Sequence, residues 1–177
     1  NDNIAIGRYA LLASVDDGDK NIAIGQSAMG GGDVSGASNI ALGTNTMDAL
    51  TSGACNIAFG VNALGAATTG CNNIALGEIA LGGAAVTGYR NVAIGHLVMD
   101  ALTSGCNNTA LGTNALGSAT TGCNNIALGE VAMGAATNNN NNVAIGNSAL
   151  AASVDDGDFN VAIGCLAMGG GDVSGDD

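Results

Sequence analysis

The stretch Asn-Ile-Ala-Ile-Gly, from Asn3 to Gly7, is the first of ten copies of one five-residue phrase along the chain. Consecutive copies begin 17 or 18 residues apart. A period this short is typical of a solenoid, because each repeat is too small to bury its own apolar face and must stack on its neighbours. The copies begin at Asn3, Asn21, Asn39, Asn56, Asn73, Asn91, Asn108, Asn125, Asn142 and Asn160.

Within each copy the side chains alternate as they do in a β-strand. Ile4 and Ile6 point to one side, and Asn3 and Ala5 point to the other. Each repeat forms one turn of the stack, which we call a rung. Stacked rungs lie ~4.8 Å apart, so equivalent residues should form columns of aliphatic side chains and of amides. We expect Ile4, Ile6, Leu11 and their equivalents to form the buried ladders, and the asparagines to form one in-register column.

Two further features complete the predicted rung. A second apolar pair, such as Ala28-Met29, follows each phrase and predicts a second short strand. A glycine then precedes each following asparagine by three residues, and Asn139 takes its place once, which favours a left-handed turn residue in that slot. These glycines are Gly18, Gly36, Gly53, Gly70, Gly88, Gly105, Gly122 and Gly157.

The small alanine at the centre of every phrase predicts close packing on its face, either by a second sheet of the same chain or by another chain. The sequence therefore predicts one all-β domain over residues 1–177, a β-solenoid of ten rungs and a rod ~48 Å long. Its core is thin, so we expect self-association, laterally on the alanine face or end to end. We call the segment that leads from one rung to the next the return. The chain begins just before a repeat and stops inside a return, which favours an excerpt of a longer fibre.

Composition narrows the function classes. The chain has 30 glycines, no proline, no tryptophan and a net charge of −12. Strong negative charge argues against nucleic acid or an anionic membrane as partner, and favours solubility and cation binding. No apolar run approaches the ~20 residues that cross a bilayer, so no membrane insertion is expected.

The phrases Thr-Gly-Tyr-Arg-Asn-Val-Ala-Ile-Gly (Thr87 to Gly95) and Thr-Thr-Gly-Cys-Asn-Asn-Ile-Ala-Leu-Gly (Thr68 to Gly77) resemble the head repeats of YadA-like trimeric autotransporter adhesins. They are similar also to repeats of phage tail fibres and other surface fibres. The resemblance implies a left-handed parallel β-roll, three chains packed side by side, an extracellular or virion-surface location, and attachment to host surfaces. The repeat here is longer than the usual head repeat of that family.

No residue pattern predicts an enzyme. His96, the only histidine, occupies a variable slot after the phrase, which we expect to face solvent. Glu78 and Glu130 share this slot three rungs apart, roughly 14 Å, too far for a paired-carboxylate site. The other residues of the slot are Arg8, Gln26, Thr44, Val61, Thr113, Asn147 and Cys165.

Two acidic turns are the candidate metal sites. Three carboxylates in one tight turn suit Ca²⁺, which takes six to eight oxygen ligands. The alternative interpretation is that Asp and Gly only form the turn and keep the rod soluble. The candidate ligands are Asp16, Asp17 and Asp19 in one turn, and Asp155, Asp156 and Asp158 in the other.

The five cysteines give one candidate disulfide. Cys106 and Cys123 lie two residues before their asparagines on adjacent rungs, with Cα atoms ~4.8 Å apart, within disulfide range. A buried, unpaired role is the alternative. Overall, the sequence favours a non-enzymatic shaft or head of an extracellular fibre used for attachment. The competing predictions are a Ca²⁺- or glycan-binding module, the latter through the Thr-rich returns, and a subunit of an end-to-end filament.

Overall fold

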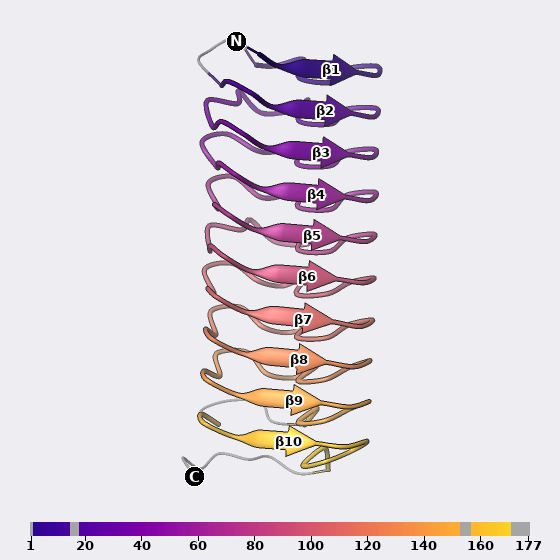
Figure 1. Cartoon of the computed structure of the whole chain (residues 1–177), viewed down its shortest axis with the longest axis vertical. Helices are drawn as coiled ribbons and strands as arrows, with labels where there is room; N and C mark the ends of the chain where they lie inside the picture. Colours follow the sequence, from indigo (N-terminus) through magenta and orange to yellow (C-terminus); the bar gives the residue numbers. More distant parts are fainter. Residues whose placement is uncertain (1, 15–17, 153–156, 171–177) are drawn as a thin grey trace.

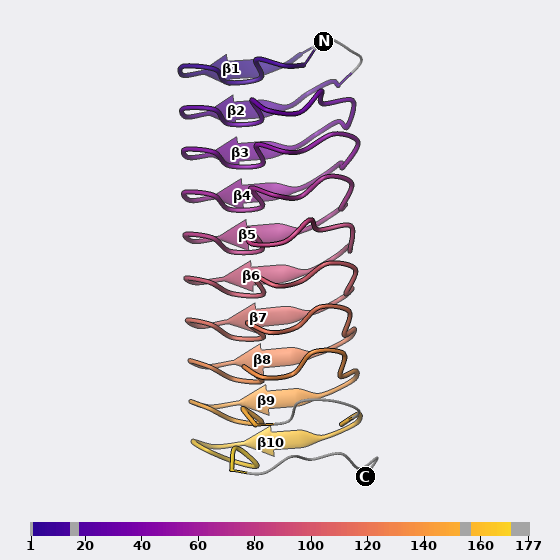
Figure 2. The same cartoon turned by 180° about the vertical axis from the view of Figure 1, so that it is seen from behind.

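The computed structural model describes residues 2–14, 18–152 and 157–170. It is a single stack of parallel strands, one per rung, in the order of the sequence (Figure 1). In Figure 1 each strand runs from left to right in front, and the chain returns behind as it descends, so the coil is left-handed; Figure 2 shows the return side. The strands are β1 (Ile4–Ile6), β2 (Ile22–Ile24), β3 (Ile40–Leu42), β4 (Ile57–Phe59), β5 (Ile74–Leu76), β6 (Val92–Ile94), β7 (Thr109–Leu111), β8 (Ile126–Leu128), β9 (Val143–Ile145) and β10 (Val161–Ile163).

The register is the one that the repeat predicts. In the first pair Ala5 lies beside Ala23, and in the last pair Ala144 lies beside Ala162. Neighbouring strands along the whole sheet pair in the same way, phrase on phrase. The predicted all-β solenoid of ten rungs is confirmed.

The two faces of the strands are the reverse of our expectation. Ala23, Ala75 and their equivalents in β2–β10 are buried, whereas Ile57 is 39% exposed and Phe59 is 60% exposed. The prediction that Ile4, Ile6 and their equivalents form buried ladders is wrong. For the Leu11 position the prediction is confirmed along the body of the rod, since Met29 and its equivalents there are buried.

The width of the coil explains why alanine lies inside. The wall opposite the sheet contributes a large side chain from each rung, such as Met29 or Leu64, which packs in the same core as the strand alanines. These large side chains fill the interior, so the sheet can supply only a methyl group without overpacking. The alanine face is therefore closed by the same chain, and lateral packing of another chain on that face is excluded.

The predicted second strand is wrong too. The segment after each phrase forms turns in which alternate residues have a left-handed backbone, such as Ser27 (φ 54°) and Met29 (φ 49°). The Ser27 N–H donates to the carbonyl of Arg8 at 2.8 Å, and the Met29 N–H donates to the carbonyl of Thr46 at 2.9 Å. This segment, which we call the turn arm, is thus hydrogen-bonded to the rungs on both sides.

The left-handed positions also differ from the prediction. Positive φ occurs at the glycine that ends each phrase, such as Gly25 (φ 139°), and at the residue just before each asparagine, such as Lys20 (φ 58°). The return glycines from Gly18 to Gly122 do not have it. They are needed for close stacking instead, because a Cβ on Gly36 would lie 1.9 Å from the carbonyl oxygen of Gly53.

Candidate functional site

The asparagines of the phrase form a continuous hydrogen-bonded column inside the coil. The side-chain oxygen of Asn21 accepts the backbone N–H of Asn39 at 2.9 Å, and the Asn39 amide donates to the carbonyl of Gly53 at 2.9 Å. The same hydrogen bond, from the backbone N–H of one asparagine to the side-chain oxygen of the asparagine on the preceding rung, recurs from Asn3 to Asn160. The expected amide column is confirmed, and it joins every rung to the next.

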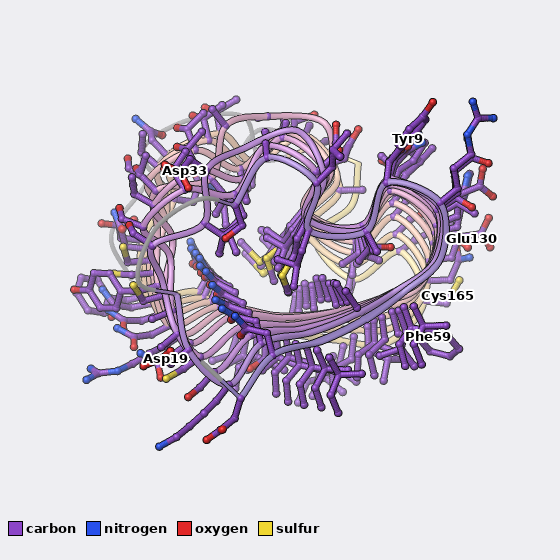
Figure 3. The ribbon with its side chains drawn as sticks, turned by 90° about the horizontal axis from the view of Figure 1, so that it is seen from above. Tyr9, Asp19, Asp33, Phe59, Glu130 and Cys165 are labelled. Carbon is purple, nitrogen blue, oxygen red and sulfur yellow. The ribbon has the colours of Figure 1, made fainter. Side chains whose placement is uncertain are left out.

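The outward side of the sheet is the main exposed apolar surface of the rod. We call the outward side chains of β1–β10 the sheet face. Figure 3, a view down the axis, shows strand side chains projecting outward along one edge of the cross-section, with Phe59 among them. All positions of this face are aliphatic or aromatic except Thr109, and none is charged.

Two mostly polar columns border the sheet face. The first is the variable slot after the phrase, where His96 and Glu130 are exposed as expected, and the Asn147 amide donates to Glu130 at 3.2 Å. In Figure 3 Glu130 lies beyond Phe59 and points to solvent. The second column is the left-handed residue before each asparagine: Lys20, Ser38, Cys55, Asn72, Arg90, Asn107, Asn124, Asn141 and Phe159.

Cys106 and Cys123 do share a column on adjacent rungs. Both are unbonded thiols, and the backbone N–H of Cys106 donates to Sγ of Cys123 at 3.1 Å. The next rung repeats the arrangement, since the N–H of Cys123 donates to the side-chain oxygen of Asn140 at 2.9 Å. The thiol therefore stands where another rung has an amide oxygen, and the disulfide stays a prediction.

The same column perturbs two titrating groups. Burial is the main cause that raises the pKa of the Cys123 thiol; the neighbouring Cys106 thiol adds to the increase, and the hydrogen bond from the Cys106 backbone N–H opposes it. A hydrogen bond with Cys106 is likewise the main cause that raises the pKa of the Tyr89 hydroxyl. Arg90 lies over the Tyr89 ring, 5.6 Å from its centroid.

The candidate calcium ligands are only partly within the described structure. Asp16, Asp17, Asp155 and Asp156 lie outside the described residues. Asp19 and Asp158 lie in the column of Cys106, eight rungs apart, and the Asp158 carboxylate accepts the backbone N–H of Asn140. Over residues 2–14, 18–152 and 157–170, no three His, Cys, Asp or Glu side chains gather closely enough to hold a metal ion. The Ca²⁺ site stays a prediction.

One threonine column of the Thr-rich returns uses its hydroxyls within the coil. Thr51 Oγ1 donates to the carbonyl of Thr68 at 2.9 Å, and Thr103 Oγ1 donates to the carbonyl of Thr120 at the same distance. These side chains thus reinforce the stacking of the return. The second hydroxyl residue of each pair is exposed, as at Thr69 and Thr121, and glycan binding stays a prediction.

The turn-arm side has a hollow that the sequence did not predict. This hollow has a volume of about 440 Å³ and is open to solvent. It spans neighbouring rungs, with a single carboxylate among its lining side chains. The residues around it are Asn45, Asp48, Asn62, Gly65, Ala66, Ile79, Gly82 and Gly83. One carboxylate without a basic or nucleophilic neighbour gives this hollow no evident chemistry.

No protein-family model, curated protein or solved structure matches this chain. No helix in the described part of the chain is long and apolar enough to span a membrane.

Proposed function

We propose that this chain is a structural element of an extracellular fibre, a rigid shaft or head that carries an attachment function. The observation that carries the proposal is the uninterrupted asparagine column from Asn3 to Asn160. Each step beyond the first is a buried hydrogen bond between a side chain and the backbone, repeated without a break, so bending between rungs would have to break bonds that water cannot replace. A stack stabilised in this way suits a spacer that holds a fixed length.

The net charge of −12 and the repeat phrases support the same role. An acidic rod stays soluble outside the cell, and it is repelled by nucleic acid and by anionic membranes. The resemblance of Thr87 to Gly95 to adhesin heads and tail fibres favours a host-surface receptor or glycan as the ultimate target.

Immunogold labelling tests this role. An antibody raised against the purified chain should decorate external fibres on intact source cells or virions, with no need for permeabilisation. Labelling that appears only after lysis would contradict an extracellular fibre. Pre-absorbing the antibody with the purified chain is the control for specificity.

A further inference from the structure

We infer that the sheet face is the surface through which copies of this chain pack against one another. The inference deepens the proposed function, and rests on it, because it names the partner and the contact surface of the fibre element. It starts from an exposure that a solitary rod does not explain. Phe59 is 60% exposed, Leu111 is 49% exposed and Ile126 is 40% exposed, in two columns that run the length of the sheet.

Charge identifies this surface as an interface between like molecules. Copies with a net charge of −12 repel one another, so they can approach closely only through a surface that carries no charge. The strand residues of β1–β10 include no Asp, Glu, Lys, Arg or His. The bordering columns are mostly polar, with Glu130 on one side and Arg90 on the other, which gives the apolar centre and polar rim of a protein interface.

The area of the face with its rim is sufficient for a stable contact. Each strand is three residues long, so the sheet face outlines about 10 Å by about 48 Å, or about 480 Å². With the two bordering columns as its rim, the outline exceeds about 800 Å², the area each partner contributes to an interface of standard size.

The repeat spacing favours a second copy over an unrelated partner. Equivalent side chains recur at every rung, ~4.8 Å apart, because the strands pair in register. A partner sheet must have the same spacing for its side chains to interdigitate along all ten rungs. Two faces of this chain meet that condition, and facing sheets pack about 10 Å apart in this way.

Sedimentation velocity on a matched pair of variants tests the inference. The face variant is Phe59→Glu with Leu111→Glu, which would place two unpaired carboxylates inside the contact. The rim variant is Val61→Glu with Thr113→Glu, which adds the same charge on the same rungs, two residues further along the chain. The rim slot already holds Glu78 and Glu130. Circular dichroism checks that each variant keeps the β-signal of the wild-type chain.

Wild-type chain should sediment as a multi-chain particle at micromolar concentration. The face variant should associate about tenfold or more weakly, as expected for charges placed at the centre of an interface, and the rim variant should behave as wild type. If the glutamates unfold the chain, Phe59→Thr with Leu111→Thr replaces them, because Thr109 shows that this face accepts threonine.

Three results would overturn the inference. They are a wild-type chain that stays monomeric at high micromolar concentration, a face variant that associates as well as wild type, and a monomer that instead co-sediments with phosphatidylcholine vesicles. The outcome of the immunogold experiment is independent of these results, because a chain can self-associate without lying on an external fibre.

Discussion

The side-chain oxygen of Asn125 accepts two hydrogen bonds from Asn142 on the next rung, one from the backbone N–H at 3.0 Å and one from the side-chain amide at 3.3 Å. The Asn125 amide in turn donates to the carbonyl of Asn139 at 2.7 Å. One buried side chain thus links the strand side of its rung, the return and the next rung. The same arrangement recurs along the rod, so its energetic contribution can be tested at one position.

Replacing Asn125 by Asp should destabilise the chain by about 1–3 kcal/mol at neutral pH, because the donor to Asn139 is lost and a charge is buried. The loss should shrink in acid, since a protonated carboxyl can donate again and burial raises the pKa of that carboxyl. Urea unfolding at neutral and acidic pH measures both effects.

Asn124→Asp is the matched control, with the same chemistry and the same added charge at an exposed neighbouring residue. It should change the free energy of unfolding little. Equal losses for the two variants would show that the buried column does not stabilise the rungs.

The inward orientation of alanine predicts a clear asymmetry between two leucine substitutions. Ala127 is fully buried against the large side chains of the turn arm, so Ala127→Leu should cost about 1–3 kcal/mol or more by overpacking. Ala85 is exposed in a return, and Ala85→Leu should be close to neutral. Thermal unfolding compares them, and an unaffected Ala127→Leu protein would mean that the alanine face is open.

Gly36→Ala should destabilise the rod because of close packing and not because of backbone conformation. The new Cβ would lie 1.9 Å from the carbonyl oxygen of Gly53, so neighbouring rungs would have to separate, at a cost of about 1–3 kcal/mol. Gly170→Ala is the control, because its Cβ would meet nothing within 4 Å. A wild-type melting temperature for Gly36→Ala would contradict this packing.

Alkylation rates should separate the cysteines. Cys55 and Cys165 are exposed, whereas the pKa of Cys123 is raised by burial, so less of its reactive thiolate is present at any pH near neutral. Iodoacetamide labelling read by mass spectrometry should modify Cys123 last, and faster as the pH rises. In urea the difference should disappear. Early labelling of Cys123 in the folded chain would disagree with its position in the column.

Salt should strengthen self-association. Added sodium chloride screens the repulsion between chains of net charge −12, while the apolar sheet face contributes no ion pair that salt could weaken. Sedimentation across a salt series gives the trend. Dissociation on adding salt would indicate a contact made by ion pairs, which the sheet face cannot supply.

Periodicity in the sequence was enough to predict the stack, but not which face turns inward. The spacing of the asparagines gives the number of rungs and their register. The usual rule that large apolar residues lie inside gave the wrong orientation, because Met29 and its equivalents already fill the coil. A signal was present in the repeats themselves, since Ala5 never varies whereas the positions of Ile4 and Ile6 accept Val, Thr, Leu or Phe.

The turn arm could not be predicted from the alternation of residue types. Its left-handed positions include Met29 and Leu64, residues that seldom adopt positive φ. The hydrogen bonds to the rungs on both sides hold the backbone in this conformation, and such tertiary bonds leave no local pattern in the sequence. The return glycines were predicted for a conformation, but the structure requires them for contact with the next rung.

The most direct test of the account is the distance between two spin labels placed far apart on the rod. Gln26 and Asn147 are exposed residues of the same column, seven rungs apart, and can be changed to cysteine in a background where the five native cysteines are serine. Pulsed electron–electron double resonance, on labelled chain diluted with unlabelled chain, should give one narrow distribution of label-to-label distances centred at ~34 Å, the rise of seven stacked rungs. A broad distribution, or a mean far from that value, would contradict a rigid in-register solenoid.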